Sequence, residues 1–212
     1  MKNKKNKIHF IHITKNAGTS IEQTLKQIGV EVGQFDRSFE KANVAHWHLP
    51  LSERSTEEIK VLENEESFAV IRNPMNRVIS EYNCKWGNPI AQSQDKRVIN
   101  YVVIKNILEI VGLLSKSGAT GHWIPQWEFI FLNNKRIIGN LLIFENLEQD
   151  WYDFAIMRGL PHRLIHKNAG SKLASKADLF MVTKLLIRIV YRRDYRLWKW
   201  QKKLKTQVQA VS

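Results

Sequence analysis

Three short apolar runs along the chain predict buried β-strands. They cover residues Ile8–Ile13, Ser67–Ile71 and Leu141–Phe144. The first run alternates too little between polar and apolar positions for a strand with one face in water. Such runs are typical of parallel strands that are covered on both faces.

Helical periodicity follows two of these runs directly. After the first run, Ile21, Leu25 and Ile28 form one apolar face, and Gly29 predicts the helix end. The helix start is predicted at two hydroxyl residues that have capping-box partners three residues later, namely Thr19 and Ser20 with Glu22 and Gln23. After the second run, Met75–Tyr82 predicts a helix whose inward residues are Met75, Val78, Ile79 and Tyr82.

Three more helices are predicted elsewhere, at Thr56–Leu62, Val98–Leu114 and Lys176–Lys203. The last is expected to be one long basic C-terminal helix with an apolar stripe formed by Leu179, Val182, Leu186, Ile189 and Val190. Strands that alternate with helices predict an α/β fold with a central parallel sheet flanked by helices. A length of 212 residues with 43% hydrophobic content suits a single domain over residues 1–212.

The charge balance predicts negatively charged partners. The chain has 33 Lys and Arg against 20 Asp and Glu, a formal net charge of +13, which attracts anions to the surface. Nucleic acid, acidic lipid, an anionic glycan and a nucleotide cofactor all fit this charge, so the positions of the basic residues must distinguish them.

The cysteine count and the chain start favour a cytoplasmic protein. Cys84 is the only cysteine, so no internal disulfide is expected. The basic start Met1–Lys7 precedes only the short run Ile8–Ile13, which His9 and His12 interrupt, so no secretion signal is expected. No window approaches the roughly 20 apolar residues of a membrane span, so we expect a soluble protein.

The turn between the first strand and its helix is a candidate anion site. Backbone N–H groups and the positive end of the helix dipole meet there, and the turn reads Lys15-Asn16-Ala17-Gly18-Thr19-Ser20. Glycine allows close approach of a phosphate, while lysine and the two hydroxyls would contact its oxygens. The alternative is that Thr19 and Ser20 only cap the helix and Lys15 is a solvated loop residue.

The ATP-type loop is a poor match, because it needs two glycines and a lysine directly before the hydroxyl residue. Residues 12–20 instead resemble the 5′-phosphosulfate loop of sulfotransferases that use 3′-phosphoadenosine 5′-phosphosulfate (PAPS), especially the carbohydrate (family 2-like) group with its P-K-T-A-G-T-S motif. Thr14 and Asn16 depart from that motif. The resemblance implies that residues 15–20 bind the cofactor and that Lys15 also assists catalysis.

A second segment, Phe68–Tyr82, resembles the 3′-phosphate motif of the same family, a strand ending in V-R-N/D-P followed by R-x-x-S-x-Y. Arg72 would present a planar fork to the phosphate, and the Ser80 hydroxyl would bond to the same group. The alternative makes Arg72 a surface ion-pair partner, Pro74 a helix start and Arg77 a solvated residue.

A pair of histidines lies between the two motifs, in Ala45-His46-Trp47-His48-Leu49-Pro50. A histidine suits removal of a hydroxyl proton near neutral pH. Some glycan sulfotransferases have H-x-H here, which implies His48 as the first candidate base and His46 as the second. Glu40 or Glu53 as base, a packing role for the histidines and a zinc pair remain alternatives.

Three later segments also resemble the carbohydrate group. Residues 121–130 resemble its H-W/F-x-P-Q stretch, which implies acceptor contacts from His122, Trp123, Gln126 and Trp127, although such aromatic residues can equally be core. Residues 142–147 resemble its Y-E-N-L strand end, with Glu145 in a structural role. A basic loop resembles its late cofactor loop and implies contacts from Lys167, Asn168, Ser171 and Lys172.

The resemblance spans residues 8–200 and implies a P-loop-like α/β sandwich that transfers a sulfuryl group from PAPS to a carbohydrate hydroxyl by in-line displacement, without a metal. The product would be adenosine 3′,5′-bisphosphate. The positive charge and the tryptophans favour an acidic oligosaccharide or a capsular polysaccharide as acceptor, and a lipid or a small alcohol is the alternative. A bacterial cytoplasmic location is expected, or a Golgi lumen location for a trimmed eukaryotic chain.

Two rival functions stay open. One is a phosphotransferase of related fold, which requires ATP and a magnesium carboxylate. The other is a non-catalytic basic module that binds anionic glycan or nucleic acid through residues 176–203. Nucleic acid is the less expected partner for an enzyme of this kind. Holding a polymeric acceptor, touching a membrane and forming a homodimer are alternative roles for the same basic region.

Overall fold

The computed structural model describes residues 7–32, 48–84, 93–115, 120–165 and 173–209. The chain divides into two compact units: Met1–Ile71 with Glu128–Lys167, and Arg72–Trp127 with Asn168–Ser212. The prediction of one domain over residues 1–212 is not tested by this division and stays a prediction.

The first unit contains the predicted parallel sheet. Its strands are β1 (Ile8–Ile11), β2 (Glu66–Ile71) and β5 (Asn140–Ile143), in the order β1-β2-β5. Both pairings are parallel, with Phe10 opposite Phe68 and Ile71 opposite Ile143. The three apolar runs are therefore strands, and β1 is shorter than predicted because it ends at Ile11.

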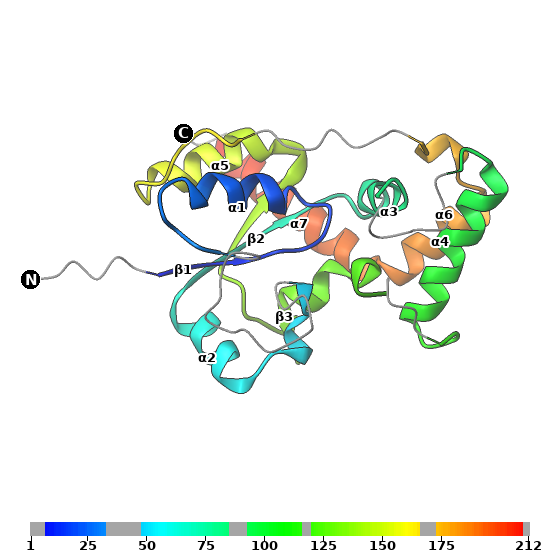
Figure 1. Ribbon diagram of the computed structural model, residues 1–212, viewed down its shortest axis with the longest axis horizontal. Helices are drawn as coiled ribbons and strands as arrows, with labels where there is room; N and C mark the ends of the chain where they lie inside the picture. Colours follow the sequence, from blue (N-terminus) through cyan, green and yellow to red (C-terminus); the bar gives the residue numbers. More distant parts are fainter. Residues whose placement is uncertain (1–6, 33–47, 85–92, 116–119, 166–172, 210–212) are drawn as a thin grey trace, which may run out of the picture. The chain divides into compact units, whose positions relative to one another are not determined.

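Helices cover this sheet (Figure 1). On one face, α1 (Gly18–Lys26) and α5 (Leu147–Ile156) pack against the sheet in one apolar cluster. The helix α2 (Thr56–Asn64) lies on the other side and begins with a capping box between Ser55 and Glu58. The predicted α/β class with a central parallel sheet flanked by helices is confirmed.

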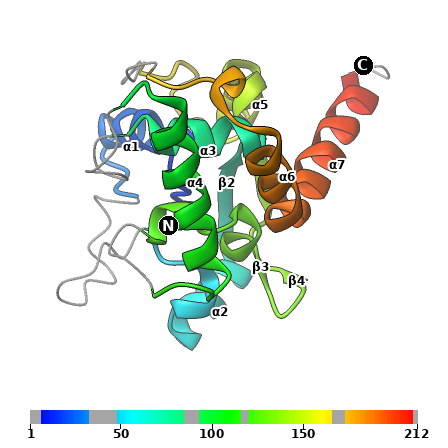
Figure 2. The ribbon, with the colours of Figure 1, turned by 90° about the vertical axis from the view of Figure 1, so that its right-hand side faces the viewer.

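The second unit is helical. Its described helices are α3 (Pro74–Tyr82), α4 (Lys96–Ile110), α6 (Met181–Val190) and α7 (Arg192–Gln209). α4 lies beside α6 (Figure 2), and both contact α3 around a shared apolar core. Of the residues predicted to face inward on α3, Met75, Val78 and Tyr82 are buried and Ile79 is partly buried. Across both units, the remaining short elements of the described residues are β3 (Phe131–Leu132), β4 (Lys135–Arg136) and 3₁₀ turns at Leu51–Glu53, Thr120–Trp123, Gln126–Phe129, Phe144–Asn146 and Lys176–Asp178.

The C-terminal region differs in detail from its prediction. A long C-terminal helix is present as α7, but the helical stretch from Lys176 is not continuous, because Tyr191 leaves the helical conformation between α6 and α7. The predicted stripe is correct only in part. Leu179 is buried and Leu186 and Val190 pack against the apolar core. Val182 and Ile189 are exposed, whereas Thr183 and Ile187 are buried. In the part of the chain that the structure describes, no helix has the length and apolar content needed to cross a membrane.

Candidate functional site

The first candidate site is the turn between β1 and α1. Lys15 and Ala17 both have positive φ, 61° and 63°. This left-handed conformation costs a non-glycine residue on the order of 1–3 kcal/mol and is concentrated at binding sites. Lys15, Ala17 and Thr19 are partly exposed, whereas Asn16, Gly18 and Ser20 are buried. The turn therefore presents alternate residues to solvent.

The start of α1 has no side-chain cap. The predicted capping box is wrong, because the N-cap is Ala17, whose side chain makes no capping hydrogen bond, so Thr19 and Ser20 lie inside the first turn. The first backbone N–H groups of a helix and the positive end of its dipole lie at such a start. This geometry suits a phosphate or sulfate group.

Asn16 holds the turn against the sheet. Its side-chain amide donates to the Val70 carbonyl oxygen at 2.7 Å, and the residue is 1% exposed. The amide thus fixes the turn to the last part of β2. This positioning role was not predicted from the sequence.

A neighbouring side chain leaves no room for a Cβ atom at position 18, so this position needs glycine. A Cβ atom at position 18 would lie 2.2 Å from Nε2 of His12. His12 is buried, and its Nδ1 lies 2.7 Å from Oε1 of the fully buried Glu22. The imidazole therefore has little freedom to move away from the turn.

His48, the first candidate base, lies beside this pair. Its ring meets the His12 ring edge to face, with 4.7 Å between the centroids, and it is partly exposed. The segment that follows is held by Arg54, whose Nε donates to the Leu49 carbonyl oxygen. Leu51 is buried. The structure thus brings His48 near the Lys15–Ser20 turn through His12.

Several predicted site residues lie outside the described residues. They are His46, Glu40, Lys167, Asn168, Ser171 and Lys172. Their roles stay predictions. Glu53, the other alternative base, lies in the 3₁₀ turn Leu51–Glu53 and is exposed.

The second candidate site begins directly after β2, at Arg72. The Gln126 side chain bonds to the Arg72 backbone twice: its Oε1 accepts from the Arg72 N–H at 2.8 Å, and its Nε2 donates to the Arg72 carbonyl oxygen at 2.9 Å. Asn73 then caps α3 by accepting from the Asn76 N–H. Ser80 lies on α3 and is partly exposed. The backbone of Arg72 is therefore fixed by a side chain 54 residues away.

Arg77 is buried, in contrast to the solvated alternative considered for it. Its guanidinium donates to the carbonyl oxygens of Ile124 and His122, both at 2.8 Å, and the residue is 1% exposed. Four residues further along α3, Glu81 is also buried, and its Oε2 lies 3.4 Å from Nδ1 of His122. Arg77 and Glu81 together fix the 122–124 segment.

Asp194 on α7 supports the residues that follow this segment. Its carboxylate accepts from the backbone N–H groups of Gln126 and Trp127, at 2.8 and 2.9 Å. Burial raises the pKa of Asp194 to about 6, although the two N–H donors and the positive charge of Arg77 oppose the shift. Asp194 was missed from the sequence. The feature of the sequence that could have indicated it is that Asp194 is the only acidic residue in the strongly basic segment 181–209.

The four predicted acceptor residues fall into two groups. Trp123 and Gln126 are buried, and the Trp123 carbonyl oxygen accepts from the Tyr191 hydroxyl. His122 and Trp127 are partly exposed, and the Arg193 guanidinium lies 5.5 Å above the Trp127 ring. Exposure therefore makes His122 and Trp127 the members of this set that a ligand can reach.

The parallel sheet flanked by helices places the chain in the α/β class, and its strand–turn–helix unit from β1 to α1 has a geometry that suits an anion. A model of the sulfotransferase family matches residues 1–201, so the chain belongs to the sulfotransferase family, as its motifs predicted. No curated protein and no solved structure matches the chain. Membership supports sulfotransfer as the general activity.

Proposed function

We propose that this chain transfers a sulfuryl group from PAPS to a hydroxyl group of a carbohydrate. The observation that supports this most is the uncapped start of α1, with Lys15 and Ala17 at positive φ, directly after a buried parallel strand. A nucleotide cofactor whose reacting end is a phosphosulfate suits such a turn. Family membership makes PAPS the expected donor.

The donor would be held by the residues of both motifs. The Lys15 ammonium, the N–H groups of residues 16–18 and the hydroxyls of Thr19 and Ser20 would contact the 5′-phosphosulfate. Arg72 and Ser80 would contact the 3′-phosphate, a group that ATP lacks. Lys167, Asn168, Ser171 and Lys172 are proposed as further cofactor contacts on the basis of sequence.

His48 is proposed as the general base. The acceptor oxygen forms a bond to sulfur while the bond from sulfur to the 5′-phosphate oxygen breaks, and His48 takes the acceptor proton. Lys15 and the turn N–H groups would stabilise the charge that develops on the departing phosphate oxygen. His46 stays the second candidate base.

The acceptor would lie against the partly exposed His122 and Trp127. The tryptophan ring suits the apolar face of a sugar, and the imidazole can bond to hydroxyls. Trp123 and Gln126 would act by packing and by fixing backbone, since both are buried. A bacterial cytoplasmic location stays a prediction from the sequence.

The test is transfer of label from ³⁵S-PAPS to a panel of neutral and acidic oligosaccharides. His48→Asn should lower kcat by about 100-fold or more, the range for loss of a general base, with little change in donor affinity. His162→Asn is the matched control, because His162 is exposed on the segment after α5. Transfer by His48→Asn at the wild-type rate would contradict the base assignment, and no transfer to any saccharide would contradict the acceptor class.

A further inference from the structure

The helix α6 has an apolar face in solvent. Met181, Val182, Leu185 and Ile189 are 79%, 56%, 55% and 49% exposed. At 100° per residue these four positions fall within about a quarter to a third of the helix circumference. Thr183 and Ile187 are buried on the opposite side. The exposed apolar row therefore belongs to one continuous face.

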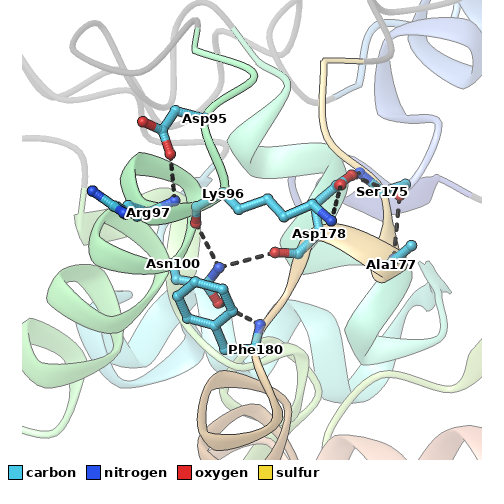
Figure 3. A network of polar contacts seen from close by, with 8 residues as sticks. All are labelled: Asp95, Lys96, Arg97, Asn100, Ser175, Ala177, Asp178 and Phe180. Atoms are coloured by element: carbon cyan, nitrogen blue, oxygen red, sulfur yellow. Dashed lines mark hydrogen bonds and ion pairs between the residues drawn. The ribbon is translucent and has the colours of Figure 1, made fainter.

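The start of α6 is firmly held, so this face is fixed on the second unit (Figure 3). The Asn100 side chain on α4 donates to the carbonyl oxygens of Lys96 and Asp178 and accepts from the Phe180 N–H at 2.7 Å. Asp178 in turn accepts from the Ser175 backbone N–H and hydroxyl. Phe180, the N-cap of α6, is itself 45% exposed.

Positive charge lies beside the row on α6 and continues along α7. Residues 181–209 contain nine Lys and Arg but only one acid, Asp194, which is 1% exposed. Arg188 is exposed next to the row on α6, and exposed cations continue along α7 at Arg192, Arg193, Arg196 and Lys199. An aliphatic face bordered by Arg and Lys has the composition of helices that lie in the plane of an anionic membrane.

The charge argues against other occupants of this face. A second copy packed on the same row would bring two sets of cations together without an exposed acid on α6 or α7 to neutralise them. Nucleic acid is bound through phosphates and stacking on aromatic rings, which does not use an aliphatic row. We propose that the exposed face of α6 docks on a lipid membrane with anionic headgroups, with the cations of α7 facing the same headgroups.

Sedimentation of the full chain with vesicles, without PAPS or acceptor, tests this docking. Vesicles of phosphatidylcholine with about one third phosphatidylglycerol should bind the chain, and pure phosphatidylcholine should bind it much more weakly. The double variant Leu185→Glu/Ile189→Glu should bind the anionic vesicles at least about tenfold more weakly. Arg192→Gln/Arg196→Gln should lose about fivefold per cation and become less sensitive to salt.

Met157→Glu is the matched control, because Met157 is 74% exposed but follows α5 in the first unit. It should bind vesicles as the wild type does, and unchanged far-UV circular dichroism should show that all variants fold. Absence of wild-type binding to anionic vesicles, or equal binding by the Leu185/Ile189 variant, overturns the proposal. A concentration-dependent dimer that this variant abolishes, without vesicle binding, also overturns it in favour of a second copy.

Discussion

Nδ1 of His12 and Oε1 of Glu22 lie 2.7 Å apart, in a pair that joins the end of β1 to α1 beneath the Lys15–Ser20 turn. Glu22 is fully buried, and His12 is 9% exposed. A buried carboxylate needs a hydrogen-bond donor, and the imidazole N–H supplies one. The pair thus fixes the imidazole against which Gly18 packs.

Loss of the Glu22 carboxylate should destabilise the fold. Glu22→Leu leaves the His12 N–H without its acceptor, and we expect the free energy of unfolding to fall by about 2–3 kcal/mol. Glu22→Gln keeps an acceptor oxygen and should lose about half as much. Urea unfolding measures both changes. An equal fall in the free energy of unfolding in the two variants would show that the hydrogen bond to His12 is not the source of the stabilisation.

Gly18→Ala should disturb the turn. The added Cβ would lie 2.2 Å from Nε2 of His12, so either the ring or the turn must shift, at a cost of about 1–3 kcal/mol. We expect lower stability in urea and weaker binding of adenosine 3′,5′-bisphosphate. Gly121→Ala is the control, since no atom lies within 4 Å of its added Cβ. Equal stability and equal ligand affinity of Gly18→Ala and Gly121→Ala would contradict the close packing of Gly18 against His12.

Arg77→Met should be among the most destabilising substitutions on α3. It removes two hydrogen bonds to backbone carbonyl oxygens and the buried positive charge near Asp194, and the expected loss is about 3–5 kcal/mol. Arg97→Met, at an exposed position on α4, should change stability by less than about 0.5 kcal/mol. Thermal or urea unfolding compares them. A small effect at Arg77 would mean that the carbonyl oxygens find other donors.

Asp194 should give stability a defined pH dependence. Its folded-state pKa of about 6 lies above the ordinary value of 3.8, because burial disfavours the charged form. The folded state therefore binds the proton more tightly, so this contribution to the free energy of unfolding is fully present below about pH 4 and is lost as pH rises through about 6. The shift corresponds to about 3 kcal/mol.

Urea unfolding of the wild type and of Asp194→Asn across this pH range measures whether the contribution of Asp194 to stability falls or rises with pH. The variant cannot titrate at this position, so the wild-type advantage over it should shrink as pH rises from about 4 to about 6. A wild-type advantage that is constant, or that grows with pH, would contradict the raised pKa.

Local patterns were sufficient to predict the strands, most helices and membership of the sulfotransferase family. Hydrophobic periodicity and turn residues predicted β1, β2, β5 and the inward face of α3, because these features depend on residues that are close in the sequence. The capping box at Thr19 was wrong because the backbone adopts positive φ at Lys15 and Ala17, which the sequence does not encode locally.

Contacts between distant residues were not predictable. The bonds of Gln126 to Arg72 and of Asp194 to Gln126 join residues 54 and 68 positions apart. On α6, the exposed residues Val182 and Ile189 were included in the predicted buried stripe, because an apolar pattern alone does not say which residues meet the core. Thr183, in the buried face, gave no hydrophobic signal.

The most direct test of the proposed function is calorimetric titration of adenosine 3′,5′-bisphosphate, with 5′-AMP and ATP for comparison. Wild type, Lys15→Ala and Arg72→Ala are compared with the exposed-charge controls Lys26→Ala and Arg97→Ala. We expect preference for the bisphosphate in the wild type and the controls, and binding weaker by about tenfold or more in Lys15→Ala and Arg72→Ala. No preference for the bisphosphate, or unchanged affinity in both of these variants, would contradict the PAPS site.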